Sequence, residues 1–242
     1  MSVLVVTGTG TGVGKTVVTA AVAALALDRG SSVAVVKPAQ TGVTPAEPGD
    51  LDEIRRLSGA ADGLELARYD LPLAPAAAAR LAGRTPPDLH AAARRVAALT
   101  ADHRLVLVEG AGGLLVRFDD EGRTIADLAR LLDAPLLVVV AAALGTLNHT
   151  ALTLEAMAHR GLRLGGLVIG AWPRHPDLAC RSNVRDLETL SARPLAGVLP
   201  EGAGRLDRAA FVRAARWGLG AELGGTFDAA DFRRSTTPDP KE

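Results

Sequence analysis

Residues 3–16 read VLVVTGTGTGVGKT, and this stretch decides the fold of the chain. An apolar strand-forming run enters a glycine-rich loop that ends in Gly14, Lys15 and Thr16, and a helix-forming run follows at once. Glycines let successive backbone N–H groups point inward, the lysine adds a positive charge, and the helix adds the positive end of its dipole. We therefore expect this loop to bind the phosphates of a nucleoside triphosphate, with the Thr16 hydroxyl on the accompanying Mg²⁺.

One position departs from the strict pattern G-x-x-x-x-G-K-[ST], which would place a glycine at position 9. The chain has Thr9 there, with Gly8 one residue earlier. The alternative is a flexible turn that happens to contain GKT. The strand before the loop and the helix after it argue against that alternative.

Short apolar runs alternate along the chain with stretches whose apolar residues are spaced three and four apart. The runs predict strands buried on both faces, at 3–6, 33–36, 105–108, 136–140, 167–169 and 195–198. The spaced stretches predict helices, at 15–27, 50–57, 89–99, 124–132, 147–159 and 178–190. This alternation predicts an α/β fold of the P-loop NTPase type, a mostly parallel sheet with helices on both faces. Its ligand should lie beyond the carboxyl ends of the strands.

Composition limits the class of protein further. The 242 residues are enough for one domain, which we expect over 1–223, followed by a polar, flexible tail over 224–242. Acidic and basic residues balance at 27 each, so we expect neither nucleic acid nor a membrane surface as a partner. A single cysteine, Cys180, excludes an intrachain disulfide framework. The start of the chain shows no leader, and the apolar run 134–144 falls short of the ~20 residues of a membrane span, so we expect a cytoplasmic protein.

Two further motifs follow buried strands. Glu109 directly follows the run 105–108 and precedes a glycine turn. A carboxylate at this position holds Mg²⁺ in P-loop proteins, from the side opposite the phosphate loop. A carboxylate that caps the next helix is the alternative. Lys37 ends the second run, so a second cation should lie beside the phosphate loop, although a lysine in that place can also be a solvated edge residue. Asp50 opens a helix and, by itself, is an ordinary N-cap.

Four motifs in this order resemble those of the dethiobiotin synthetases: VTGTGTGVGKT, KPAQTG, LVEGAGGLLV and GTLNHT. The resemblance runs from residue 3 to about 200. It implies a homodimer that uses ATP or another nucleoside triphosphate, Mg²⁺ and CO₂ or bicarbonate to convert 7,8-diaminononanoate into dethiobiotin. The intermediates would be a carbamate and a carbamic-phosphoric anhydride.

The resemblance also assigns residues. Lys37 and Lys15 match catalytic positions, and the metal ligands would be Thr16, Asp50 and Glu109. The substrate-binding set would be Thr11, Thr41, Gly112, Leu147 and Asn148, the last two reaching the substrate of the partner subunit. The nucleotide-binding set would be Gly12, Val13, Gly14, Lys15, Thr16, Val17, Asp50, Glu109, Gly110, Ala111, Gly112, Gly170, Ala171, Leu199, Pro200 and Glu201.

Three positions depart from the family pattern. Gly12 stands where some members have an acidic residue, and Asn183 lies near a position where some have a tyrosine that reaches the partner's substrate. Gly170 replaces an asparagine that reads the nucleotide base in some members. We therefore expect loose discrimination among nucleoside triphosphates, with residues 199–201 after the last strand bordering the base.

His149 is a candidate general base, but we favour a histidine that caps or packs in the first turn of a helix, because carbamate chemistry needs charge stabilisation more than a titrating imidazole. The other histidines, which we expect on the surface, are His90, His103, His159 and His175. Two other functional classes share this fold. A switch or partitioning ATPase would need an early lysine in the phosphate loop or an NKxD motif, and a cobyrinate-type amidoligase would need a reactive cysteine, for which Cys180 is a poor candidate.

Overall fold

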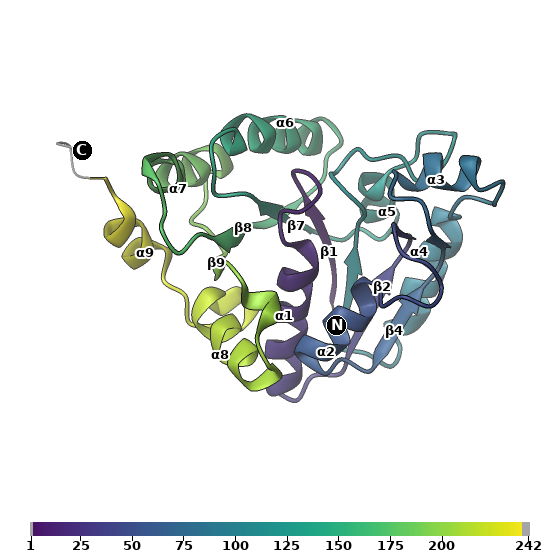
Figure 1. Ribbon diagram of the computed structural model, residues 1–242, viewed down its shortest axis with the longest axis horizontal. Coiled ribbons are helices and arrows are strands. Elements are labelled where there is room, and N and C mark those ends of the chain that lie inside the picture. Colours follow the sequence, from purple (N-terminus) through teal and green to yellow (C-terminus); the bar gives the residue numbers. More distant parts are fainter. Residues whose placement is uncertain (1, 239–242) are drawn as a thin grey trace.

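A computed structural model describes residues 2–238, and its centre is a parallel sheet of seven strands in the order β4-β2-β6-β1-β7-β8-β9 (Figure 1). Every strand pair in it is parallel. The strands are β1 Ser2–Gly8, β2 Val33–Lys37, β4 Asp62–Glu65, β6 Leu105–Glu109, β7 Leu136–Val140, β8 Leu164–Trp172 and β9 Gly197–Pro200. A second, two-stranded sheet pairs β3 Gln40–Thr41 with β5 Arg68–Tyr69.

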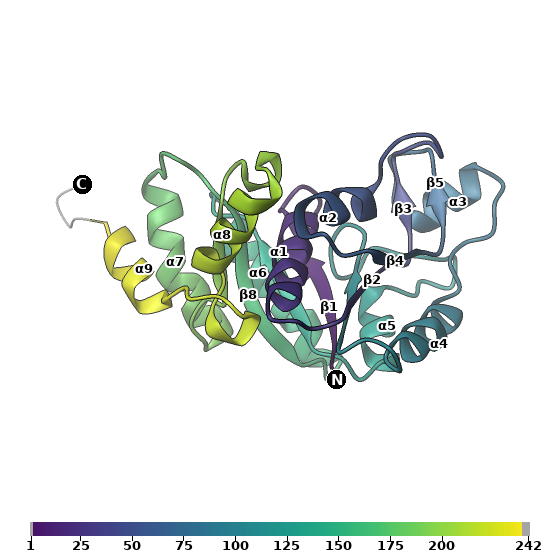
Figure 2. The ribbon, with the colours of Figure 1, turned by 90° about the horizontal axis from the view of Figure 1, so that it is seen from below.

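Helices cover both faces of the large sheet (Figures 1 and 2). One face carries α1 Lys15–Asp28, α2 Asp50–Ser58 and α8 Arg208–Gly218, which contact one another. The other face carries α4 Leu89–Leu99, α5 Ile125–Leu131, α6 Thr146–His159 and α7 Leu178–Ser191. The remaining helices are α3 Pro75–Leu81, which packs on the small sheet, and α9 Ala229–Thr236, which packs on α7.

Burial on both faces explains why the central strands are apolar throughout. In β7, Leu136, Val138 and Val140 join one core cluster, whereas Leu137 and Val139 join the other. Successive side chains of a strand point to opposite faces, so a strand covered by helices on both sides has no polar face. The predicted fold class is confirmed.

The sequence prediction misses several elements and misplaces two boundaries. It omits β4, α3, α8 and the small sheet. Strand β8 continues through Gly170 and Ala171 to Trp172, which pairs with Pro200. Leu199 and Pro200 therefore lie inside β9 and not after it.

The segment after 224 is not the frayed coil we expected, because it contains α9. Asp228 caps this helix, and Phe232 lies edge-on to Trp172 with 5.0 Å between ring centroids. Arg233 also pairs with Glu188 of α7 at 2.5 Å. Aromatic packing thus orders a stretch whose composition is mostly polar, while residues 239–242 of the expected tail lie outside the described residues. Within residues 2–238, no helix has the length and apolar character that a membrane crossing requires.

Candidate active site

Strand register brings the three sequence motifs together. The neighbours β2, β6 and β1 are paired so that Val36 lies opposite Val108 and Val6 lies opposite Glu109. Parallel strands end at the same edge of a sheet, so Lys37, Glu109 and the loop after β1 meet there.

The phosphate loop has the backbone that its glycines permit. Gly12 and Gly14 have φ angles of 76° and 96°, in the left-handed region that favours glycine. Lys15 opens α1, and its Nζ donates to the Gly10 carbonyl at 2.8 Å. Two glycines of this stretch are closely packed: a Cβ on Gly8 would come within 2.7 Å of a Val13 methyl group, and a Cβ on Gly14 within 2.8 Å of the Gly170 carbonyl oxygen.

Lys37 stands at the centre of a buried charge cluster. Its Nζ donates to Glu109 Oε1 at 2.8 Å and to the Gly110 carbonyl at 3.2 Å, and it pairs with Asp50 Oδ2 at 2.5 Å. Thr16 Oγ1 donates to the same Glu109 oxygen at 3.0 Å. The residue exposures of Lys37 and Glu109 are 3% and 0%. Lys37 is therefore a buried, fully paired ammonium, not a solvated edge residue.

Burial and neighbouring charge set the protonation states. For Lys37, burial favours the neutral amine, but Glu109 and then Asp50 outweigh it and raise its pKa. For Lys15, burial is the largest influence and the charge of Lys37 the second, and together they lower its pKa to about 8. Burial also opposes ionisation of Asp50, yet the charge of Lys37 prevails and lowers the pKa of that carboxyl. The two lysines thus differ in how firmly they hold a proton.

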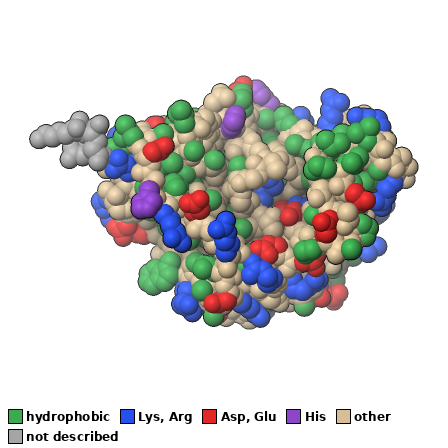
Figure 3. All heavy atoms as spheres, in the orientation of Figure 1, with side chains coloured by type: hydrophobic (Ala, Val, Ile, Leu, Met, Phe, Trp, Pro, Cys, Tyr) green, Lys and Arg blue, Asp and Glu red, His purple; other side chains and the backbone are tan. Residues whose placement is uncertain are grey.

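A cavity of about 730 Å³ opens over this cluster. Basic and acidic side chains lie close together near the middle of the face shown in Figure 3. The sequence-predicted residues that line the cavity are Thr11, Gly12, Gly14, Lys15, Thr16, Val17, Lys37, Thr41, Asp50, Glu109, Gly110, Ala111 and Gly112. Both predicted lysines and all three predicted metal ligands are therefore in one place.

The residues assigned to the base do not line this cavity. Gly170 is buried under the phosphate loop, where a Cβ would come within 2.0 Å of the Val13 carbonyl oxygen. Leu199 is fully buried in the core, so its side chain faces away from the surface. Ala171 and Glu201 are exposed at the ends of β8 and β9. The absence of an asparagine at 170 thus has a steric reason: the backbone of the phosphate loop fills that space.

Leu147 and Asn148 lie in the first turn of α6 and outside this chain's cavity. His149 follows them and lines a separate shallow cavity of about 290 Å³ with Leu115, Val116 and Leu152. His149 is exposed, so it neither caps the helix nor packs in the core.

Two side chains have roles that the sequence did not indicate. Asn183 is buried and donates to the carbonyls of Ala142 and Ala143 at 2.9 and 3.3 Å, so it fixes the loop between β7 and α6. His103 is more enclosed than expected, because its ring bonds to Asp62 at 3.0 Å and to the Leu99 carbonyl at 3.0 Å. His90, His159 and His175 are exposed as expected.

Sequence reasoning missed one wall of the cavity. Ala39, Pro72–Pro75 and Val116 also line it, and they supply its apolar part. The sequence signal for this wall was the proline-rich string LPLAP at residues 71–75. Because the small sheet was not predicted, nothing indicated that this string lies near Lys37. Gln40, inside the quoted motif KPAQTG, was missed as well, and it also lines the cavity.

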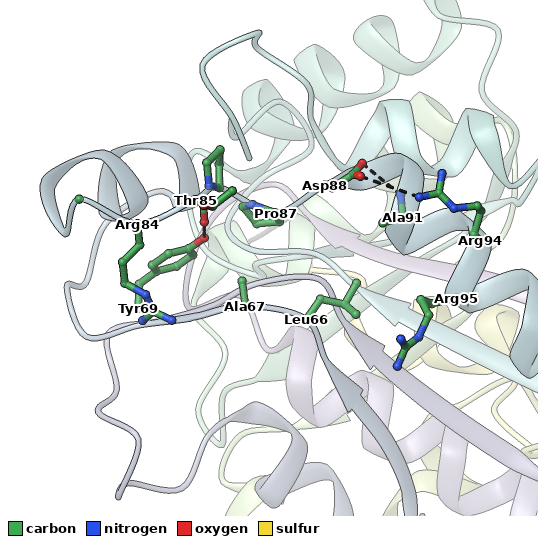
Figure 4. A pocket seen from close by; sticks show the side chains of 12 residues that line it. Leu66, Ala67, Tyr69, Arg84, Thr85, Pro87, Asp88, Ala91, Arg94 and Arg95 are labelled. Atoms are coloured by element: carbon green, nitrogen blue, oxygen red, sulfur yellow. Dashed lines mark hydrogen bonds and ion pairs between the residues drawn. The ribbon is translucent and has the colours of Figure 1, made fainter.

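Another cavity, of about 830 Å³, lies between β5 and α4 (Figure 4). Arginines surround it, and the Tyr69 hydroxyl beside it already donates to the Thr85 carbonyl at 2.7 Å. It contains neither a phosphate loop nor a buried carboxylate, so the cavity over Lys37 is the better candidate for the active site.

The oxygen atoms of the cluster fit Mg²⁺. Glu109 Oε2 is buried and has no hydrogen-bond partner, although a buried carboxylate oxygen is normally paired. Thr16 Oγ1 bonds to the other oxygen of Glu109, and Asp50 Oδ2 pairs with Lys37, so two more oxygens belong to the same cluster. In residues 2–238, no group of three or more histidine, cysteine or acidic side chains is gathered as a metal site. Mg²⁺ suits such a sparse set, since it takes one or two carboxylates and completes its shell with phosphates and water.

Known proteins resemble this chain in sequence and in fold. A sequence family described as AAA domain matches residues 2–204. The septum site-determining protein MinD from Pyrococcus horikoshii superposes with a TM-score of 0.57 at 16% identity, over 92% of this chain and 94% of that one. At that identity, the likeness shows the fold alone.

Sequence relatives are much closer. The ATP-dependent dethiobiotin synthetase of a Parafrankia species is 65% identical over 97% of this chain and 98% of its own length. The enzyme of the same name from Streptomyces avermitilis is 57% identical over 98% of this chain and all of its own length, 100%. This chain belongs to the ATP-dependent dethiobiotin synthetase family.

Proposed function

We propose that this chain uses ATP and CO₂ to close the ureido ring of dethiobiotin on 7,8-diaminononanoate. Lys37 carries this proposal: it is buried between Asp50 and Glu109 and lies in one cavity with Lys15 and an apolar wall. Cations are what the anionic intermediates of this reaction require, and the apolar wall suits an aliphatic chain.

The first step needs a neutral amine. That amine attacks the carbon of CO₂, a C–N bond forms, and the nitrogen loses a proton to leave a carbamate. Lys15 and Lys37 disfavour a third positive charge nearby, so they lower the amine pKa and then stabilise the carbamate anion.

The second step transfers phosphate. A carbamate oxygen attacks the γ-phosphorus, the bond to ADP breaks, and a carbamic-phosphoric anhydride forms. Backbone N–H groups of the phosphate loop and of the turn at 110–113 are available to hold the phosphoryl oxygens. Thr16, Asp50 and Glu109 would hold Mg²⁺, which would supply neutralisation of the phosphate charge.

The third step closes the ring. The second amine attacks the carbonyl carbon of the anhydride, loses a proton, and expels inorganic phosphate. Thr11, Thr41 and Gly112 line the same cavity as the lysines, which supports their assignment to aligning the two nitrogens.

The carboxylate end of the substrate would reach a second copy of the chain. Leu147 and Asn148 begin α6 outside this chain's cavity, and helix N-termini favour anions. Leu115, Leu144 and Leu152 near them have exposures of 47%, 87% and 57%, which suits a surface covered in a homodimer.

Two other functions receive less support. The fold shared with MinD leaves a switch ATPase open as a class, but the phosphate loop has no early lysine. Cys180 is buried and burial raises its thiol pKa, so it is a poor nucleophile for an amidoligase.

The test is a phosphate-release assay with ATP, Mg²⁺, bicarbonate and diaminononanoate, omitting each in turn. Release should require all four, and mass spectrometry should detect dethiobiotin in equal amount. Release that does not depend on the diamine would refute the proposed function.

A further inference from the structure

Arg68 lies on β5 outside the cavity wall, yet it holds the segment that delivers Asp50. Its Nε and Nη2 donate to both oxygens of Glu65 at 2.7 and 2.9 Å. Its Nη1 donates to the carbonyls of Thr44 and Glu47 at 3.0 and 2.7 Å. One guanidinium therefore ties the end of β4 to the segment 42–49, which leads directly into α2.

Gln40 holds the end of the same segment. It is the strand partner of Arg68 in the small sheet, and its Oε1 accepts from the Asp50 backbone N–H at 2.8 Å. Gly49 is wedged between the two side chains: a Cβ there would come within 2.8 Å of Arg68 Nη2 and 3.0 Å of Gln40 Oε1. The backbone that enters Asp50 is thus fixed from both sides.

Strand β5 is itself anchored (Figure 4). The Tyr69 hydroxyl donates to the Thr85 carbonyl at 2.7 Å, and Arg84 lies over the Tyr69 ring at 5.3 Å from its centroid. Arg84 Nη1 also donates to the Arg68 carbonyl at 2.6 Å. The base of the Arg68 side chain is therefore fixed before it reaches segment 42–49.

Segment 42–49 has backbone bonds mostly at its ends: the Gly42 N–H donates to the Tyr69 and Leu71 carbonyls, and the Gly49 N–H donates to Asp52 Oδ2 at 2.8 Å. Between these ends, Pro45 and Pro48 have no N–H to donate, and Thr44 and Glu47 bond to each other and to Arg68. Lys37 pairs directly with the Asp50 carboxylate at 2.5 Å, whereas segment 42–49 sets the backbone from which that carboxylate projects. Mg²⁺ requires near-octahedral geometry, so a shift of this backbone should weaken its binding.

We propose that Arg68 is a positioning residue that sets the Asp50 carboxylate for the divalent metal of the reaction. This inference rests on the assignment of Asp50 to the metal in the proposed function. Arg68 acts through Thr44, Glu47 and Gly49 and does not touch substrate or nucleotide.

The test compares Arg68→Gln with a matched control on α3, Arg80→Gln, which breaks an exposed ion pair to Asp120. Mn²⁺ binding to the protein with ADP is measured by electron paramagnetic resonance, alongside thermal unfolding. Arg68→Gln should raise the Mn²⁺ dissociation constant about tenfold, as loss of an outer support for a metal ligand does. Turnover should require correspondingly more Mg²⁺ and recover at saturation, whereas Arg80→Gln should match wild type.

If Arg68 only stabilises the fold, Arg68→Gln should lower the unfolding temperature, and the folded variant should bind Mn²⁺ with an unchanged dissociation constant. The inference is overturned if Asp50→Asn weakens Mn²⁺ binding while Arg68→Gln binds like the control; the proposed function then stands. If Asp50→Asn binds Mn²⁺ normally, Asp50 is not a ligand and the inference falls, but the diamine-dependence assay still judges the function separately. If Arg68→Gln does not fold, the Mn²⁺ dissociation constant of Glu65→Gln is measured instead, because this variant removes the charge that orients the Arg68 guanidinium. A raised constant supports the inference, and an unchanged constant overturns it.

Discussion

Replacing Lys37 with methionine tests the charge cluster most directly. Methionine has a similar length and fills the same buried space, so Lys37→Met removes charge and hydrogen bonds with little change in packing. It leaves Glu109 fully buried, with Thr16 as its one remaining hydrogen-bond donor among the described residues.

The expected loss of stability follows from that burial. Removing one partner of a buried ion pair typically costs ~3–5 kcal/mol, because an uncompensated charge stays in the interior. Glu109 has no exposed surface, so its charge is poorly solvated. Turnover should also fall by about a hundredfold or more, as it does when one charge donor to a transition state is lost.

Urea unfolding of the nucleotide-free protein at neutral pH measures the first effect, and single-turnover phosphate release measures the second. Glu109→Gln in the same background is the control, because a neutral amide no longer needs the lysine. The double variant should therefore be more stable than Lys37→Met alone. The reasoning is refuted if Lys37→Met unfolds within about 1 kcal/mol of wild type, the size of an exposed pair, or if the double variant recovers nothing.

Three further predictions concern other parts of the chain. The hydrogen bond to Asp62 raises the pKa of His103, so the contribution of this bond to stability is full below the ordinary pKa of 6.5 and is lost as pH rises through the raised pKa. His103→Gln should therefore lower the free energy of unfolding more at about pH 5.5 than at about pH 8.5, by less than about 1 kcal/mol, in paired urea titrations. Gly170→Asn should raise the KM of ATP and CTP alike, because the side chain would displace Val13; a gain in ATP preference of about a hundredfold, 2.7 kcal/mol, would contradict this. Phe232→Ala should lower the free energy of unfolding by about 2 kcal/mol with unchanged turnover, and an equal loss of turnover in the folded protein would contradict the separation of α9 from the site.

The sheet and the charged half of the site could be predicted because their signals are local. Each central strand contains an apolar run, and the phosphate loop, Lys37 and Glu109 each follow one directly. Asp50 follows no strand directly, and only the family resemblance assigned it. Lys37 and Glu109 end adjacent strands, so the rule that ligands bind beyond the carboxyl ends of parallel strands placed them together.

The remaining features depend on contacts between distant segments. The small sheet has two residues in each strand, too few for any periodicity, yet it brings the Pro72–Pro75 wall to the cavity. Helix α9 lies in a polar stretch, and only the packing of Phe232 on Trp172 reveals why it forms. Asn183 bonds to carbonyls about forty residues earlier in the chain, which no local pattern encodes.

The contact between Gly170 and the phosphate loop also bears on protein engineering. The carbonyl of Val13 occupies the space of a side chain at 170, so this position cannot be redesigned without moving the loop that holds the phosphates. Ala171, one residue further along β8, is exposed and can accept a larger side chain. A library that enlarges side chains at this end of β8 should therefore begin at 171 and leave 170 as it is.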